Sequence, residues 1–237
     1  MNGSGVTNQF AHSGDFGDII YALPTIRACG GGRLALFDAP GKTAHGMNPR
    51  RAGIIIPLLK AQPYIEDAYF TTDAVDHAIN GFRDHPHGNL SDKHLSTMGL
   101  SWRERDTKWL EVDRAVHAAD VVICRSSRYN NPNFPWSRVL ATYPGRCGFI
   151  GLADEHRHFT VRFGSVPYIR ADNLLDVARI IAGSRLYIGN YTAATAVAEG
   201  LKHPSVVEVD PGCHMLGMFH RVGVAHGWDD NVELPQC

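Results

Sequence analysis

The sequence predicts an α/β protein with two domains, each built on a parallel sheet, that face one another across a cleft. Short apolar runs typical of strands alternate with stretches of helical periodicity, which predicts parallel strands joined by helices. The alternation restarts near residue 115, and a chain of 237 residues is long enough for two small domains. We therefore expect domains at residues 1–114 and 115–237.

The bulk composition is that of a globular protein, with 44% hydrophobic and 20% charged residues. The net charge of -1 gives no overall positive field that would attract nucleic acid, although it leaves a local basic groove open. The longest strongly apolar run, residues 54–59, is too short to cross a bilayer, so we expect no integral membrane segment. The five cysteines are dispersed and residues 1–5 lack a signal-peptide pattern, which predicts a cytoplasmic protein without a disulfide framework.

The first half has the pattern of repeated strand–helix units. Gly30, Gly31 and Gly32 end its first helix, and Pro57 predicts an interruption of its second. We expect strands at residues 6–11, 33–37, 67–70 and 77–80, and helices at 19–27, 49–61 and 90–100.

The second half repeats the pattern. Its clearest helix is at residues 173–182, where apolar side chains recur on one face. We expect strands at residues 120–124, 147–152, 185–189 and 205–209, a short extended piece at 166–169, and further helices at 134–143 and 192–201.

A glycine turn with two aspartates follows the first strand. It contains Ser13, Gly14, Asp15, Gly17 and Asp18, and it stands at the carboxyl end of the predicted sheet, where open α/β sheets bind ligands. A structural turn needs only one capping aspartate, so the pair indicates a catalytic or binding role. The two glycines allow a ligand to approach the backbone. The alternative is that Asp18 merely caps the helix from residue 19 and that the glycines are ordinary turn residues.

Polar residues also follow the first strand of the second half. Arg125, Ser126 and Arg128 form the loop at its end. Arginines at such a position bind a nucleotide diphosphate bidentately and without a metal. A solvated loop with surface arginines is the alternative, and the sequence favours neither.

Two further segments of the second half predict nucleotide contacts. Thr192 and Ala193 begin a helix after Asn190, where a hydroxyl and backbone N–H groups suit a phosphate; a plain N-cap is compatible with this. Glu155 follows another strand, where its carboxylate suits a nucleoside ribose or base. The alternative for Glu155 is a surface loop. No grouping of histidines and cysteines has metal-ligand spacing, so we expect no metal.

Three segments resemble the bacterial heptosyltransferase family, whose members have the two-domain GT-B fold. Residues 13–25 look like the family's Gly-Asp-x-x-x-x-x-Pro opening. Residues 58–67 resemble its helix-Pro-Tyr-Ile-Asp passage, and residues 173–209 contain a helix, a strand and Gly-Asn in the family's order. The resemblance implies a compact GT-B protein with two Rossmann-like domains.

The resemblance also implies a function. A metal-independent glycosyltransferase of this kind moves a sugar from a nucleotide-sugar donor to a hydroxyl of a saccharide or lipid-linked glycan, with the donor as substrate and no cofactor. The N-terminal domain takes the acceptor and the C-terminal domain the donor. Asp18 matches the family's catalytic base, which takes the hydroxyl proton. Asp15 shares that role, binds acceptor hydroxyls or holds the turn.

The sequence departs from the family pattern after Asn190. Tyr191, Ala193 and Ala196 stand where the family has Asp, Gly and His, so the donor sugar is left open. One alternative acceptor is a hydroxylated base in DNA. Another alternative is a non-catalytic protein that binds a nucleotide or sugar. A nicotinamide-binding protein is a weaker alternative, because the opening turn lacks the full dinucleotide fingerprint.

Overall fold

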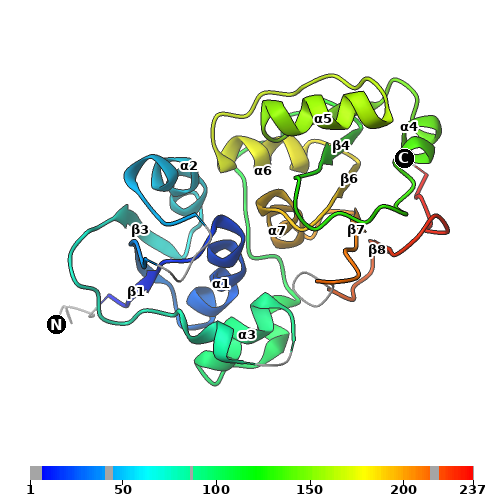
Figure 1. The fold of residues 1–237 in the computed structure, drawn as a ribbon. Helices are drawn as coiled ribbons and strands as arrows, with labels where there is room; N and C mark the ends of the chain where they lie inside the picture. Colours follow the sequence, from blue (N-terminus) through cyan, green and yellow to red (C-terminus); the bar gives the residue numbers. More distant parts are fainter. Residues whose placement is uncertain (1–6, 41–44, 86–87, 214–218, 237) are drawn as a thin grey trace. The chain divides into compact units, whose positions relative to one another are not determined.

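The chain folds into two compact units with parallel sheets (Figure 1). The computed structural model describes residues 7–40, 45–85, 88–213 and 219–236, so the predictions made for residues 1–6 lie outside the described part. Unit 1 is Met1–Glu111 and unit 2 is Val112–Cys237, a division at residue 111 where the sequence placed it at 114. The α/β class with parallel strands is confirmed. Among the described residues, no helix combines the length and apolarity that a membrane crossing requires.

Unit 1 is built on a parallel sheet in the order β1-β2-β3. Helix α1 packs against α3, and α2 packs against β3. The elements are β1 (Gln9–His12), α1 (Phe16–Ala28), β2 (Gly32–Leu36), α2 (Pro49–Lys60), β3 (Ile65–Phe70), the 3₁₀ helices η1 (Gly81–Asp84) and η2 (Trp102–Arg105), and α3 (Leu90–Thr97).

Two details of unit 1 differ from the prediction. Helix α2 runs through Pro57 without interruption, because buried Ile55 before it and buried Leu58 and Leu59 after it hold both halves against the unit. The strand expected at residues 77–80 is reduced to a single parallel bridge between Ala11 and Ala78.

Unit 2 has a parallel sheet in the order β5-β4-β6-β7-β8. A buried cluster that includes Val121, Ile123, Trp136, Phe149 and Ile188 forms its main core. The elements are β4 (Val121–Cys124), α4 (Trp136–Thr142), β5 (Cys147–Phe149), α5 (Ala153–Phe163), α6 (Leu174–Ala182), β6 (Leu186–Gly189), α7 (Ala193–Gly200), β7 (Ser205–Glu208) and β8 (Val224–Gly227).

The sequence does not predict two elements of unit 2. Helix α5 was not predicted because Phe159 is its one buried residue, so no apolar stripe marks it. Glu155 therefore lies in the first turn of a helix and not in a loop. Strand β8 was missed because its Val-Ala-His-Gly sequence is too short and polar to show a strand pattern.

In both units the order in which strands are added to the sheet reverses at the first strand. In unit 1, β2 pairs with one edge of β1, while Ala11 exchanges hydrogen bonds with residues 77 and 79 on the other edge. In unit 2, β5 and β6 pair with opposite edges of β4. Open α/β sheets bind ligands at such switch points, beyond the carboxyl ends of the strands. The loops after β1, β4 and β6 therefore stand where a ligand is expected.

Gly189, at the end of β6, provides a test of how closely the carboxyl ends of β4 and β6 pack together. A Cβ there would lie 2.3 Å from Tyr187 Oη and 2.4 Å from the carbonyl oxygen of Cys124, so Gly189→Ala forces the strand ends apart. We expect a loss of about 1–3 kcal/mol of unfolding free energy in urea titrations. The control is Gly53→Ala in α2, where a Cβ meets no atom within 4 Å and helix propensity predicts a small gain. Equal stability of the two variants would contradict the packing.

Candidate functional site

The aspartate loop, residues 13–18, connects β1 to α1. Asp15 is the N-cap of α1, and its backbone N–H donates to Asp18 Oδ2 at 3.2 Å. Asp18 lies inside the first turn of the helix and is 8% exposed. The interpretation of Asp18 as the cap of a helix from residue 19 is therefore wrong, because the helix starts at Phe16 and Asp15 is the cap.

The two glycines of the aspartate loop have different surroundings. A Cβ on Gly14 would lie 2.5 Å from His12 Cε1 and 2.7 Å from Asp18 Cβ, so this position requires glycine for packing. A Cβ on Gly17 would meet no atom within 4 Å, so Gly17 borders open space. Of the two, Gly17 fits the predicted approach of a ligand to the backbone.

Each aspartate of the loop has an arginine partner that the sequence did not reveal. Arg51, from α2, donates to Asp15 Oδ1 at 2.9 Å, and Arg83, from η1, donates to Asp18 Oδ2 at 2.6 Å. Ser13 is held by Asn80, because its N–H donates to the Asn80 side-chain oxygen and its hydroxyl accepts from the Asn80 amide. Nothing local in the sequence marks these partners, which lie 36 to 67 residues away.

A buried aromatic stack underlies the aspartate loop. His12 and His94 are both 0% exposed, with ring centroids 5.1 Å apart, and the Phe82 ring lies against both. His12 Nδ1 accepts the N–H of Gly14 at 2.8 Å, which fixes the start of the loop. Burial, together with the nearby Arg83 charge, lowers the pKa of His12 to about 3 and also lowers the pKa of His94. Both rings are therefore neutral at pH 7.

In unit 2, Asn190 joins the loop after β4 to the loop after β6. We call residues 125–131 the β4 loop. The Asn190 side-chain oxygen accepts the N–H of Ser126 at 3.0 Å, and its amide donates to the carbonyl of Arg128 and to the side chain of Asn130. Asn190 is 0% exposed. Its buried side chain therefore fixes the conformation of the β4 loop through these hydrogen bonds.

The β4 loop is held in a strained conformation. Tyr129 has a positive φ of 55°, which is rare for a residue with a side chain and costs about 1–3 kcal/mol. The exposed Arg128 stacks its guanidinium 5.3 Å from the centre of the Tyr129 ring. The Arg128 charge also acts on half-buried Glu155, where it partly offsets the rise in carboxyl pKa that burial causes. Arg128 and Glu155 thus lie within electrostatic range of one another.

Thr192 is the N-cap of α7, and its hydroxyl accepts the N–H of Thr195. Thr192 and Ala193 are half-buried. The Thr192 hydroxyl lies 3.7 Å from Cys124 Sγ, at the end of β4, so the start of α7 stands beside the β4 loop. The structure therefore brings together Ser126, Arg128, Asn190 and Thr192 at the switch point of unit 2.

Arg125 has a partner inside the chain. Its guanidinium makes two hydrogen bonds, at 2.9 and 3.0 Å, to Glu208 at the end of β7. Glu208 is 0% exposed and also accepts the N–H of Asn131 and the indole N–H of Trp136. Loss of one partner of a buried ion pair costs about 3–5 kcal/mol, so Arg125 and Glu208 anchor the β4 loop. The one signal for Glu208 in the sequence was a carboxylate in an otherwise apolar strand.

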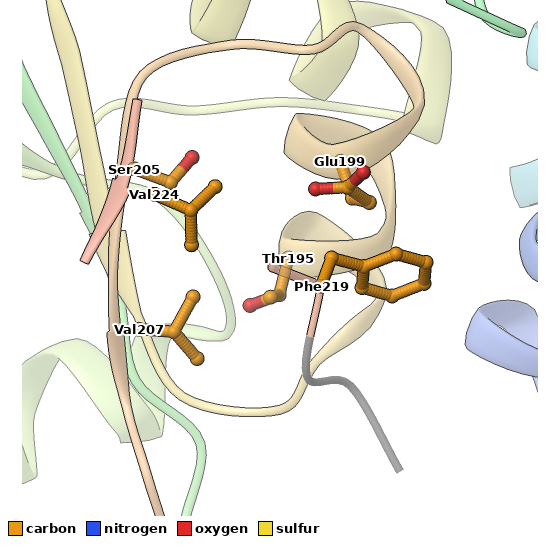
Figure 2. A pocket seen from close by; sticks show the side chains of 6 residues that line it. All are labelled: Thr195, Glu199, Ser205, Val207, Phe219 and Val224. Atoms are coloured by element: carbon orange, nitrogen blue, oxygen red, sulfur yellow. The ribbon is translucent and has the colours of Figure 1, made fainter. Parts of the chain in front are cut away.

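A small cavity lies beneath α7, between Thr195 and Glu199 of the helix and Val207 and Val224 of the sheet (Figure 2). Its volume of about 10 Å³ is the size needed for one water molecule. Glu199, on its wall, is already paired with Arg221 and Lys202. The cavity is therefore too small for a nucleotide or a sugar.

Comparisons with solved structures identify the fold. The glycosyl transferase of family 9 from Veillonella parvula matches with a TM-score of 0.61 and 10% identity, over 93% of this chain and 86% of that one. The Escherichia coli ADP-heptose LPS heptosyltransferase II matches with a TM-score of 0.56 and 11% identity, over 92% of both chains. The iron-containing heptosyltransferase TibC matches with a TM-score of 0.54 and 16% identity, over 91% of this chain and 61% of that one.

The chain has the fold of these glycosyltransferases. The resemblance to heptosyltransferases that three sequence segments carry is thus confirmed for the fold. No family model and no curated protein matches the sequence.

The buried histidine His12 predicts a pH-dependent stability. Its pKa is about 3 in the folded chain and 6.5 in the unfolded chain, so between these values the unfolded chain binds more protons. His12 therefore does not change the free energy of unfolding above about pH 6.5. Below that pH its contribution lowers the free energy of unfolding, by at most about 1.4 kcal/mol per pH unit. Urea titrations at pH 7 and pH 5 measure this slope.

The variant His12→Asn keeps an acceptor for the Gly14 N–H but does not titrate, so we expect a shallower loss of stability between pH 7 and pH 5. The buried His94 supplies part of the slope that remains. His158→Asn, on the exposed side of α5, is the control and should retain the full slope. An unchanged slope in His12→Asn would contradict a neutral buried His12.

Proposed function

We propose that this chain is a metal-independent glycosyltransferase that uses a nucleotide-sugar donor. The observation that carries the proposal is the fold, which is shared with glycosyltransferases over more than nine-tenths of the chain. The proposal further requires that the two units act as Rossmann-like domains that face one another across a cleft, with the acceptor on unit 1 and the donor on unit 2.

The donor diphosphate is proposed to bind at the switch point of unit 2. Arg128 supplies an exposed positive charge, and the first N–H groups of α7, at Ala193, supply the positive end of a helix. Ser126 supports Arg128, because its hydroxyl donates to the Arg128 carbonyl and accepts the Arg128 N–H. Half-buried Glu155 supplies a carboxylate for ribose hydroxyls. Arg125 and Asn190 act from beneath, since their side chains hold the β4 loop. Two of the similar structures are described as complexes with ADP-linked heptoses, so ADP is a suitable probe.

The acceptor hydroxyl is proposed to meet Asp18. The oxygen of the acceptor hydroxyl attacks the anomeric carbon of the donor. At the same time the bond between that carbon and the diphosphate oxygen breaks, and the nucleoside diphosphate leaves with the electron pair. Asp18 takes the hydroxyl proton as general base. Asp15, ion-paired with Arg51, shapes the acceptor side of the same loop. The proposal leaves the sugar and the acceptor, whether saccharide, lipid-linked glycan or nucleic acid, to be measured.

One observation favours a second candidate, a protein that binds a nucleotide or sugar without transferring it. Tyr191 stands where the family pattern has an aspartate, and it is 8% exposed, in an apolar cluster with Val207 and Val209. The Tyr129 ring lies against it at 6.2 Å. The carboxylate of the family pattern is therefore missing at this position, and an aromatic side chain packs there instead. Retained ADP binding without turnover of any donor would select this candidate.

Arg128 is the first residue to test for donor binding. We expect Arg128→Gln to weaken ADP binding about tenfold or more in calorimetric titrations, because a charged hydrogen bond contributes about 1.5–3 kcal/mol. The control is Arg157→Gln in α5, which removes an exposed arginine paired with Asp154 and should bind like the wild type. Equal affinity of all three proteins would reject the proposed phosphate site.

Asp18 is the residue to test for catalysis. We expect Asp18→Asn to lower the release of nucleoside diphosphate from the active donor by about 10²–10⁴-fold, because the base is lost. ADP affinity should remain, since the proposed ADP contacts lie in unit 2. Asp73→Asn, an exposed aspartate of unit 1, is the control. Wild-type turnover by Asp18→Asn would rule out the base assignment.

A further inference from the structure

The pairing of residues 77–79 with β1 carries Arg83 to the aspartate loop. The N–H of Ala11 donates to the carbonyl of His77 at 3.2 Å, and the N–H of Ile79 donates to the carbonyl of Ala11 at 2.9 Å. Helix η1 follows directly, so its arginine lies at the carboxyl end of β1. Arg83 thereby reaches Asp18, which is 65 residues earlier in the chain.

The contact between Arg83 and Asp18 is short, and it joins an exposed side chain to a mostly buried one. Arg83 Nη2 lies 2.6 Å from Asp18 Oδ2, and the Asp18 side chain is 12% exposed while that of Arg83 is 53% exposed. A carboxylate that is mostly removed from water is stabilised strongly by a directly bound cation. The guanidinium faces solvent on its other side, so it shields Asp18 without being buried itself.

Arg83 is held over Asp18 by the aromatic stack. Its guanidinium carbon lies 4.7 Å from the centre of the Phe82 ring, and Phe82 is 2% exposed. The Phe82 ring lies 4.1 Å from the His94 ring and 5.7 Å from the His12 ring. Because both imidazoles are neutral at pH 7, they support Arg83 without repelling it. The position of the guanidinium is thus fixed by packing as well as by charge.

We propose that Arg83 is a positioning residue that holds the Asp18 carboxylate ionised and in place until it accepts the proton of the acceptor hydroxyl. This inference rests on the proposed function. When the proton moves to Asp18, the ion pair becomes a hydrogen bond from the guanidinium to a neutral acid, which then returns its proton to solvent. Arg83 therefore extends the base form of Asp18 to lower pH.

Other groups around Asp18 come from each element packed against it. Asp15, at the start of α1, is paired with Arg51 of α2. His12 of β1 and His94 of α3 are neutral at pH 7, so they add no charge at neutral pH. The Arg83 guanidinium contacts the Asp18 carboxylate directly, so removal of Arg83 should make the Asp18 carboxylate easier to protonate.

The pH dependence of donor turnover tests this role. In Arg83→Gln, the acidic limb of the rate profile should move about one pH unit or more upward. Arg83→Lys retains the charge and should keep the limb closer to that of the wild type. ADP affinity, a property of unit 2, should be unchanged in both. Arg103→Gln, an exposed arginine beside Trp102, is the matched control. A limb in Arg83→Gln that coincides with that of the wild type would overturn the proposal.

A second measurement does not depend on turnover. A ¹³C NMR titration of the Asp18 carboxyl should show protonation at higher pH in Arg83→Gln than in the wild type. Identical titration midpoints would overturn the role of Arg83. Failure of the wild type to turn over any donor, together with a shifted Asp18 titration, would reject the glycosyltransferase proposal while Arg83 still controls the ionisation of Asp18. The two failures are therefore distinguishable.

Discussion

Each unit depends on one strand from which successive parallel strands are added first along one edge and then along the other. Strand β1 lies between β2 and residues 77–79, and β4 lies between β5 and β6. The chain leaves such a strand toward one side and returns on the other, so no connecting helix covers the strand's carboxyl end. The loops that follow β1 and β4 therefore lie beyond the carboxyl edge of each sheet, and their bases are fixed by the sheet. This constraint places the aspartate loop and the β4 loop, whereas Asn190 and Thr192 follow β6 and Glu155 follows β5.

Buried and half-buried polar side chains fix the conformation of these loops. Asn190 and Glu208 are both fully buried, and between them they bind most of the β4 loop. His12 and Asn80 do the same for the aspartate loop. A buried polar group without partners is costly, so each loop is tied to the geometry that satisfies these groups. Because such loops are already ordered, ligand binding does not have to offset the entropic cost of ordering them.

The sequence predicted the elements whose residues carry their own signal. The strand β4 was identified because all of its residues are apolar and buried, and helix α6 because its buried residues recur at helical spacing. Helix α5 was not identified, because a helix anchored by Phe159 alone has no such period. The position of Asp18 in a turn after β1 was predicted, whereas its place inside the first turn of α1 was not, since Asp15 is an equally good cap.

The partners of the site residues could not be predicted from one sequence. Arg125 suited a phosphate by position, but its guanidinium binds Glu208, 83 residues later, and only the sheet order β4-β6-β7 brings them together. Arg83 reaches Asp18 through a single bridge at Ala78, which has no strand pattern of its own. Residue types indicated the chemistry of the site, while the long-range pairing determined which groups are exposed to a ligand and which hold the loops.

The central claim is that a nucleotide binds at the switch point of unit 2. Chemical-shift mapping of the wild-type chain with ADP tests it most directly. The account predicts that the backbone amide resonances of Ser126, Arg128 and Ala193 shift as ADP saturates the chain, while those of Gly14 and Gly17 stay unchanged. An absence of shifts at the β4 loop and the start of α7, or shifts confined to the aspartate loop, would contradict the account.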